Sequence, residues 1–388
     1  MMKNLLYTII LFVVAPIIYA QQKTHQINKS FLFESKVLTG NREIWIHVPE
    51  IEKKSLENPQ SVFPVIYVLD AEHNFLNTVG ITQALSRANL MPNVIVVGIS
   101  GLYREYDYSP TNINVDYMKT GGGPNFLTFL SSELIPYINK EFPSSNHNTI
   151  VGHSIGGMFT LYSLVENTNK VFSNYLAISP SLWWDNQSLA NDWKTHLKTL
   201  KLKESKQVFI TMADEAKLSN DGKAMHNQYL EFKNSVKNRS NFKIEYLDLF
   251  KEDHLSTVTP AMHYGLKFLF QNWCIDHYYN THNFSGLKES LQNLSMIYNF
   301  NVAPDYNQLV NMGRYYYNKK EYKKAINIYE FGLESYDEGL MLNGYVAQAY
   351  LKNGELEKAK KHFNKGLEIA TIKQSPMSSW FKKELTKL

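Results

Sequence analysis

The sequence predicts an α/β fold with a mostly parallel sheet, followed by a smaller all-α segment. Between residues 30 and 273, short runs rich in β-branched and aromatic residues alternate with longer helical stretches. Repeated strand, helix, strand order places parallel strands in one sheet with helices on both faces. After Asp276 the strand-like runs stop, and a self-similarity at a fixed offset follows.

Several of the expected strands are continuous apolar runs bounded by turns. Such runs are typical of strands that are covered on both faces, because both rows of side chains are then buried. A helix that closes the α/β part is expected over residues 266–273. The strands are expected at residues 44–48, 62–69, 94–99, 149–151, 175–178, 208–212 and 242–247.

The C-terminal segment, residues 276–388, carries an internal repeat. Its period is that of tetratricopeptide helix-turn-helix units, in which small residues let paired helices approach and aromatic residues fill the gaps. Stable arrays normally stack about three units, and two are clear here. The segment is either a packing appendage or a groove that binds a protein partner. The matched positions are Tyr316, Ala325, Tyr329, Gly332 and Leu333, which recur as Tyr350, Ala359, Phe363, Gly366 and Leu367.

Composition and charge exclude several classes of protein. Of 388 residues, 44% are apolar and 20% are charged, so the chain can bury a large core and is neither mainly disordered nor fibrous. Forty Lys and Arg against 36 Asp and Glu leave a net charge of +4. That excess is too small for a nucleic-acid groove, which needs basic residues concentrated on one face. We therefore expect no nucleic-acid partner.

The N-terminus has the pattern of a secretory signal peptide. Lys3 precedes an apolar stretch of sixteen residues, 5–20, that ends in alanine. A retained anchor is the alternative, but a spanning helix needs about 20 apolar residues and this stretch contains Pro16. We expect residues 1–20 to be removed and the protein, with no later membrane span, to be periplasmic or secreted. The single cysteine, Cys274, excludes an internal disulfide and is expected to be buried.

One motif carries a nucleophile. Gly152-His153-Ser154-Ile155-Gly156 follows a strand-like run and precedes a helical one, which is the context that the G-x-S-x-G nucleophile elbow requires. The glycines allow strained backbone at the serine and close approach of strand and helix. The hydroxyl of Ser154 is then presented above the sheet at the positive end of a helix dipole, where acyl transfer develops negative charge.

A serine nucleophile needs a base, and at such an elbow the chain order is nucleophile, acid, base. The base is therefore expected on a loop after the last strand, 242–247, where His254 stands among polar residues. His147 and His153 precede the serine, and His226 stands in a helical segment, so they fit less well. His254 is the predicted general base.

The acid should follow the strand at 208–212, which places it at Asp214 or Glu215. Its role is to hold the imidazole in the right tautomer and to stabilise its positive form. We favour Glu215, while Asp214 and a serine-histidine dyad without an acid both stay open. The expected oxyanion donors are the backbone N–H groups of Ile155 and of Ala71, which follows an earlier strand.

Further blocks of sequence accompany the elbow. They are Tyr67-Val68-Leu69-Asp70, Val97-Gly98-Ile99, Arg104-x-x-Asp107-x-x-Pro110-Thr111, Gly121-Gly122-Gly123, Glu133-Leu134-Ile135-Pro136-Tyr137 and Ser179-Pro180-Ser181-Leu182-Trp183-Trp184. With these blocks, residues 37–273 resemble the putative-esterase branch of the α/β-hydrolases. That branch includes ferric enterobactin esterases, feruloyl esterases and S-formylglutathione hydrolases of the esterase D type. The enterobactin-esterase-like subgroup is the most similar, and some of its members are similar in carrying C-terminal helical repeats.

The resemblance implies an α/β-hydrolase fold over residues 26–275. It further implies hydrolysis of carboxylic esters through an acyl-enzyme, without a metal or nucleotide cofactor. Ala71 departs from the glycine that many relatives have, but a backbone N–H donor remains. After His254 many relatives have glycine, where this chain has leucine.

Two accessory residues are candidates for substrate binding. Trp183 and Trp184 are either core aromatic residues or the lining of an acyl pocket. Arg104 either contacts substrate or pairs with Asp107 to hold a loop beside the sheet.

The predicted function is that of an exported serine esterase acting on a small-molecule ester. A siderophore trilactone, a feruloyl or acetyl sugar and a simple lipid ester all remain open as substrates. An acyltransferase would use the same residues. The alternative is a binding protein in which the hydrolase fold is a scaffold and the helical repeats recruit a partner.

Overall fold

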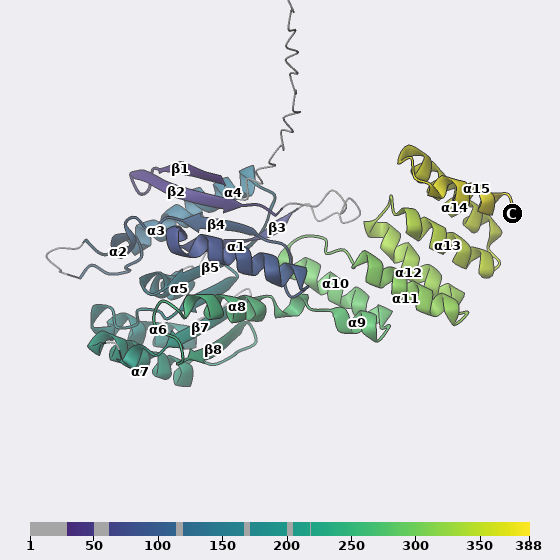
Figure 1. The fold of residues 1–388 in the computed structure, drawn as a ribbon. Coiled ribbons are helices and arrows are strands. Elements are labelled where there is room, and N and C mark those ends of the chain that lie inside the picture. Colours follow the sequence, from purple (N-terminus) through teal and green to yellow (C-terminus); the bar gives the residue numbers. More distant parts are fainter. Residues whose placement is uncertain (1–28, 50–61, 114–118, 167–170, 200–204, 218) are drawn as a thin grey trace, which may run out of the picture.

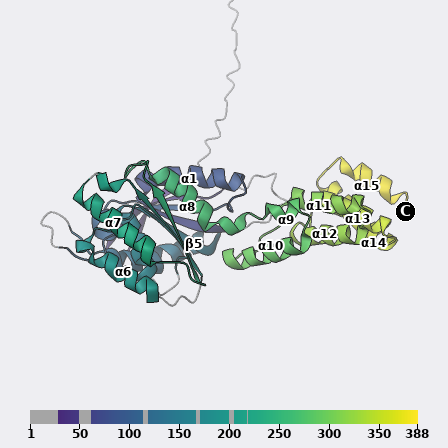
Figure 2. The ribbon, with the colours of Figure 1, turned by 90° about the horizontal axis from the view of Figure 1, so that it is seen from below.

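The structure is a computed structural model, shown in Figure 1, and it describes residues 29–49, 62–113, 119–166, 171–199, 205–217 and 219–388. The expected signal peptide, residues 1–20, lies outside these residues. The described chain forms a sheet with helices on both faces, and a helical segment extends from one end of it (Figures 1 and 2).

The described strands join into one eight-stranded sheet with the order β1-β2-β4-β3-β5-β6-β7-β8. β2 pairs antiparallel with both β1 and β4, and the strands from β4 to β8 in this order pair parallel. The sheet is therefore mixed, with its parallel part as predicted and an antiparallel edge that was not predicted. The strands are β1 (Lys29–Ser35), β2 (Gly40–His47), β3 (Phe63–Leu69), β4 (Ile95–Ile99), β5 (Ser144–His153), β6 (Asn174–Ile178), β7 (Lys206–Ala213) and β8 (Phe242–Leu249).

Burial along each strand follows its place in the sheet. The inner strands β3 and β7 are buried at every residue, because helices cover both faces. The edge strand β1 is mostly exposed, and Leu32 at its centre is 68% exposed. The seven predicted strands are confirmed, whereas β1 was missed because it contains no continuous buried run.

Two hydrophobic cores lie on opposite faces of the sheet. In β3, Tyr67 and Leu69 pack with the helices from α3 to α7, while Ile66 and Val68 pack with α1 and α8. This alternation is the two-residue period of a strand. The helices of this part are α1 (Ala71–Arg87), α2 (Arg104–Asp107), α3 (Gly123–Phe129), α4 (Ile135–Glu141), α5 (Ile155–Glu166), α6 (Ser188–Thr199), α7 (Asn220–Ser235) and α8 (Val258–Leu269).

The segment after α8 is helical. α11 and α13 begin at Tyr306 and Leu340, and α12 and α14 begin at Tyr322 and Leu356, so the two pairs have the same spacing. The period seen in the sequence is thus also a period of helices, while their identity as tetratricopeptide units stays a prediction. The helices are α9 (Asp276–Asn280), α10 (Phe284–Tyr298), α11 (Tyr306–Asn318), α12 (Tyr322–Ser335), α13 (Leu340–Lys352), α14 (Leu356–Ile372) and α15 (Met377–Leu385).

The base of this helical segment shares a core with the sheet. Leu287 and Leu291 of α10 and Leu309 of α11 belong to the same buried cluster as residues of α1 and α8. The more distant helices form a cluster of their own around Tyr350 and Phe363. The segment is therefore packed against the sheet at one end and projects away from it at the other (Figure 2).

Two further expectations concern single features of the chain. Cys274 is exposed, so the prediction of a buried thiol was wrong. It stands in the short connection between Trp273 and α9, where the chain leaves the sheet. Among the helices that the structure describes, none combines the length and apolar character that crossing a bilayer requires.

Candidate active site

The chain turns sharply at Ser154, between β5 and α5. Ser154 has φ of 61°, a left-handed conformation that is strained for a residue with a side chain. A Cβ at Gly152 would collide with the backbone at the start of α5, and one at Gly157 would lie 2.9 Å from the carbonyl oxygen of Ile178. The glycines are needed because strand and helix touch at this turn. Ser154 therefore has the backbone geometry of a nucleophile elbow.

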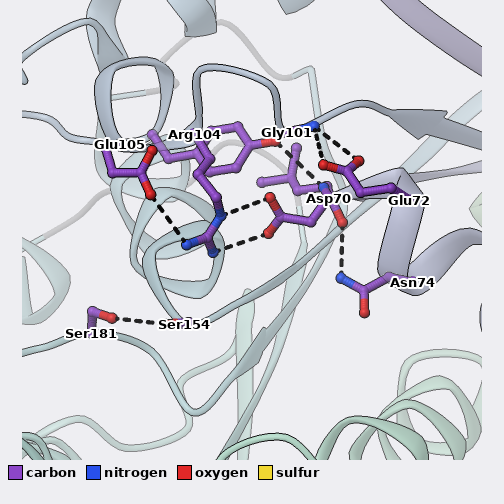
Figure 3. A network of polar contacts seen from close by, with 10 residues as sticks. Asp70, Glu72, Asn74, Gly101, Arg104, Glu105, Ser154 and Ser181 are labelled. Atoms are coloured by element: carbon purple, nitrogen blue, oxygen red, sulfur yellow. Dashed lines mark hydrogen bonds and ion pairs between the residues drawn. The ribbon is translucent and has the colours of Figure 1, made fainter. Parts of the chain in front are cut away.

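The hydroxyl of Ser154 has a second serine as a neighbour. Its Oγ lies 3.2 Å from Oγ of Ser181, and Figure 3 draws this contact as a dashed line. The backbone N–H of Ser181 also donates to the carbonyl oxygen of Ser154, at 3.0 Å. Ser181 is 2% exposed, whereas Ser154 is partly exposed and lines a pocket. Sequence reasoning did not select Ser181, although it lies just after β6.

His254 and Glu215 form a hydrogen-bonded pair. Nδ1 of His254 lies 2.7 Å from Oε1 of Glu215, whose side chain is 2% exposed. A carboxylate only accepts, so Nδ1 carries the proton and Nε2 is left as an acceptor. Asp214, the open alternative, instead pairs with Lys217 at the surface. The structure thus brings Glu215, and not Asp214, to the histidine.

These side chains meet because of the sheet topology. Ser154 follows β5, Glu215 follows β7, and His254 lies in the connection from β8 to α8. β5 and β7 both pair parallel with β6, and β8 pairs parallel with β7, so the carboxyl ends of all three strands lie at one edge. Ligands of open α/β sheets bind at that edge.

Ser154 and His254 line the same pocket. Its volume is about 570 Å³, enough for a small molecule. Most of its lining side chains are polar, and Leu255 and Val258 are the apolar ones. The lining residues are Asp70, His73, Asn74, Asn77, Arg104, His153, Ser154, His254, Leu255, Val258 and Thr259.

Arg104 reaches this pocket with a partner that the sequence did not predict. Its Nε and Nη2 donate to the two carboxylate oxygens of Asp70, at 2.9 and 3.2 Å (Figure 3). The expected partner, Asp107, instead binds Arg42 through two hydrogen bonds, and both of those side chains are buried. The predicted pairing of Arg104 with Asp107 was therefore wrong. β3 delivers Asp70 to the pocket edge, whereas Asp107 points back towards β2.

Burial and the ion pair act on Asp70 in opposite directions. Burial raises the pKa of Asp70, and the hydrogen bonds and charge of Arg104 offset part of that rise. Arg104 is 29% exposed, and its guanidinium is held between two carboxylates, with Nε and Nη2 on Asp70 and Nη1 3.8 Å from Oε1 of Glu105. A planar cation fixed in this way suits recognition of oxygen acceptors.

The two predicted oxyanion donors both stand at helix starts. Ile155 opens α5 and Ala71 opens α1, and the first N–H groups of a helix have no partner within it. Asp70 has φ of 55° immediately before Ala71, so the chain turns sharply at the end of β3 as it does at the end of β5. Both N–H groups lie next to pocket-lining residues.

The two predicted tryptophans are placed differently from the other candidates. Trp184 is 1% exposed and its Nε1 donates to Oγ1 of Thr111 at 3.1 Å. Trp183 is partly buried against the core, and it is not among the residues that line the pocket. Contact of Trp183 with substrate stays a prediction.

The pocket also contains residues that sequence reasoning missed. His73, Asn77 and Thr259 line it from α1 and α8, and Asn77 donates to Oγ1 of Thr259 at 3.1 Å. Their place in the sequence could have indicated them, because α1 begins directly after β3 and α8 follows the loop that carries His254. In the described part of the chain, no group of three or more His, Cys, Asp or Glu side chains is arranged to hold a metal ion.

Comparison with known proteins shows which family the chain belongs to. Residues 35–251, more than half of the chain, match the family described as "Putative esterase". The chain belongs to this family. Ester hydrolysis is the activity that the family, the named relatives and the fold support, which confirms the predicted enzyme class.

The relatives of this esterase include named siderophore enzymes. Ferri-bacillibactin esterase BesA of Bacillus subtilis is 25% identical over 263 residues, which are 61% of this chain and 88% of that protein. A siderophore enterobactin esterase of Emericella nidulans is 29% identical over 178 residues, which are 38% of this chain and 56% of that protein. An IroE-like serine hydrolase from Shewanella oneidensis has a similar structure, with a TM-score of 0.63 and 25% identity. That match covers 79% of this chain and 99% of the other. None of these names supports the binding-protein alternative.

Proposed function

We propose that this esterase uses Ser154 as nucleophile and His254 as general base to cleave a polar, siderophore-type ester. The observation that carries the proposal is that Ser154 and His254 line one pocket while the His254 ring is held by Glu215 at 2.7 Å. A strained serine, an oriented imidazole and a buried carboxylate are the three parts of a hydrolytic triad.

The mechanism follows from the donors and acceptors of the site. Ser154 Oγ attacks the ester carbonyl while Nε2 of His254 takes its proton. The buried Glu215 carboxylate stabilises the resulting imidazolium. The tetrahedral intermediate collapses when His254 returns the proton to the leaving alkoxide, and an acyl-enzyme remains. Water, deprotonated by His254, then attacks the acyl group and releases the acid and free Ser154.

The oxyanion of each intermediate is assigned to two backbone donors. Ile155 and Ala71 are the first residues of α5 and α1, so their N–H groups lie at the positive ends of helix dipoles. Backbone donors of this kind stabilise charge where it develops, and removing one side-chain donor in a comparable site costs about 10²–10³ in kcat.

The lining of the pocket supports a polar substrate. His73, Asn77 and Thr259 contribute donors and acceptors to the lining, and Arg104 contributes a cation that is bound to Asp70. Leu255 and Val258 are the apolar residues of the lining. The relatives whose names specify siderophore esters point to the same class. Arg104 is proposed to bind oxygen acceptors of the substrate. Trp183 does not line the pocket, so its contact with the substrate requires a movement of the segment that carries it.

A hydrolysis panel tests the proposed substrate class. The purified protein is given bacillibactin and enterobactin, a feruloylated sugar, and nitrophenyl esters with short and long acyl chains. We expect the siderophore esters to give the highest kcat/KM and the long-chain ester the lowest. Highest activity on the long-chain ester would contradict the argument from the pocket lining. Product analysis with added alcohol acceptors separates hydrolysis from acyl transfer.

Replacement of the nucleophile tests the mechanism separately. Ser154→Ala should lower kcat by at least about 10³ and abolish labelling by a fluorophosphonate probe. Ser173→Ala is the matched control, since Ser173 lies before β6 at the opposite end of the sheet. Its activity should equal that of the parent. Unchanged turnover by Ser154→Ala would remove Ser154 from the mechanism.

We also propose that the chain is exported and organised in two parts. Residues 1–20 would be a signal peptide, residues 26–275 the esterase domain and residues 276–388 a tetratricopeptide-like domain that can bind a protein partner. Support comes from the N-terminal sequence pattern and from helices that recur at a constant spacing. N-terminal sequencing of protein from the periplasm or medium of the expressing cell tests the first point. An intact Met1 there would contradict it.

A further inference from the structure

His153, the residue before the nucleophile, contacts the base directly. Its Nε2 lies 2.7 Å from the backbone carbonyl oxygen of His254. A carbonyl oxygen only accepts, so Nε2 of His153 carries the proton and donates. The side chain that precedes the nucleophile therefore holds the main chain of the residue proposed as base, although the two lie 101 positions apart in the sequence.

The two rings also pack on each other. The ring centroids of His153 and His254 are 4.5 Å apart, with 44° between the planes. The bond to the carbonyl oxygen locates the backbone of His254, and the ring contact limits the tilt of its imidazole. Glu215 supplies a third contact, at 2.7 Å from Nδ1 of His254. Together these contacts restrict the movement of the imidazole in the pocket that Ser154 also lines.

The loop that carries His254 is also tied to the end of β7, where the backbone N–H of Asp214 donates to the carbonyl oxygen of Glu252 at 3.1 Å, and it has further bonds of its own. Oδ1 of Asp253 accepts from the backbone N–H groups of Leu255 and Ser256, at 2.9 and 2.8 Å. Such bonds give the turn its shape and do not tie it to the elbow. The bond from His153 does so, because His153 is the last residue of β5 and belongs to the sheet.

The charge state of His153 suits this role. The side chain is 8% exposed, and burial lowers the pKa of His153 to about 3, with the nearby His254 adding to the effect. Arg104 is a further charged group that acts on it. His153 is thus neutral when His254 becomes an imidazolium during turnover. A cation at position 153 would repel that imidazolium, whereas a neutral donor does not.

We propose that His153 is a positioning residue that sets the location and tilt of the His254 imidazole above Ser154. The inference rests on the proposed function, in which His254 is the base. Misplacement of a reacting group by about 1 Å can lower a rate by about 10². A residue that only fills the core would instead affect stability and leave the turnover of folded protein unchanged.

The test uses variants that separate the donor from the ring. His153→Gln keeps a neutral donor near the position of Nε2, and His153→Asn is too short to reach the carbonyl oxygen. His153→Phe keeps a ring and loses the donor. We expect kcat on a short-chain chromogenic ester to fall about tenfold to 100-fold in the Asn and Phe variants, by analogy with misplaced groups. KM should change less than about twofold, and Gln should restore most of kcat.

His147 supplies the matched control. It is 6% exposed, its Nδ1 lies 2.9 Å from the carbonyl oxygen of Ile297, and its ring packs on Tyr298. It stands near the other end of β5, away from the pocket. His147→Phe should lower the melting temperature and leave kcat unchanged. Equal kcat in the parent, His153→Asn and His153→Gln would overturn the inference, and this comparison stands even if His153→Phe does not fold.

A Ser154→Ala variant keeps the two proposals distinguishable. If Ser154→Ala is inactive while all His153 variants keep parental kcat, the proposed function stands and the positioning role fails. If Ser154→Ala is fully active, the proposed function fails, and the positioning role fails with it.

Discussion

Replacement of Glu215 by glutamine is the sharpest test of the geometry around the base. The Glu215 carboxylate is 2% exposed and lies 2.7 Å from Nδ1 of His254. A hydrogen bond to a charged group contributes about 1.5–3 kcal/mol, and breaking a buried pair of opposite charges costs about 3–5 kcal/mol. The imidazolium exists only in the transition state and intermediates, so this loss raises the activation barrier. At about 1.4 kcal/mol per tenfold change in rate, these losses mean that Glu215→Gln should lower kcat by about 10-fold to 4,000-fold.

The assay is steady-state hydrolysis of a short-chain chromogenic ester, with kcat and KM determined separately. Asp214→Asn is the control, because Asp214 is adjacent in sequence but pairs with Lys217 at the surface, and such pairs contribute at most about 1 kcal/mol to stability. Its kcat should stay within about twofold of the parent, since it contacts none of the reacting groups. Similar kcat values for the parent and Glu215→Gln would refute the assignment of Glu215 as the group that stabilises the imidazolium.

Three further predictions concern stability. Gly152→Ala should destabilise the fold by about 1–3 kcal/mol or more, because the added Cβ collides with backbone. Gly80→Ala is the control: its Cβ meets nothing within 4 Å, so it should stabilise α1 by about 0.5–1 kcal/mol. Equal melting temperatures for the two variants would contradict this prediction. Asp107→Asn should lower the free energy of unfolding, measured in urea, by about 3–5 kcal/mol, because it leaves the buried Arg42 charge without its partner. A decrease below about 1 kcal/mol would contradict this and would show that water reaches Arg42. Burial lowers the pKa of His147 to about 4 from 6.5, so the unfolded chain takes up this proton first and stability falls as the pH drops from 6.5 to 4. The free energy of unfolding should fall by about 3 kcal/mol over this range. In His147→Gln it should depend less on pH. Identical pH profiles of unfolding for the parent and the variant would contradict this prediction.

The parts of the site that the sequence predicts are those with a local or ordered signal. Gly152, Ser154 and Gly156 indicate the elbow because a strained turn between strand and helix tolerates few other residues. His254 was predicted from chain order and from its place on a polar loop after the last strand. Glu215 was favoured over Asp214, but only the fold shows which carboxylate faces inward, because neighbouring residues on a turn point in different directions.

The missed features depend on contacts between distant segments. The partner of Arg104 is Asp70 and not the nearby Asp107, since the strand order brings the end of β3 beside α2. The edge strand β1 escaped notice because its exposed face interrupts any apolar run.

By itself, the sequence determined the alternation of buried strands and helices, the repeat of the C-terminal helices and the position of the elbow. These are local properties of the chain, which follow from hydrophobic periodicity and from the placement of glycines. The tertiary structure alone decided which side chains share the pocket and that His153 holds the backbone of His254. Such pairings arise when parallel strands align their carboxyl ends, and no local pattern of residues encodes them.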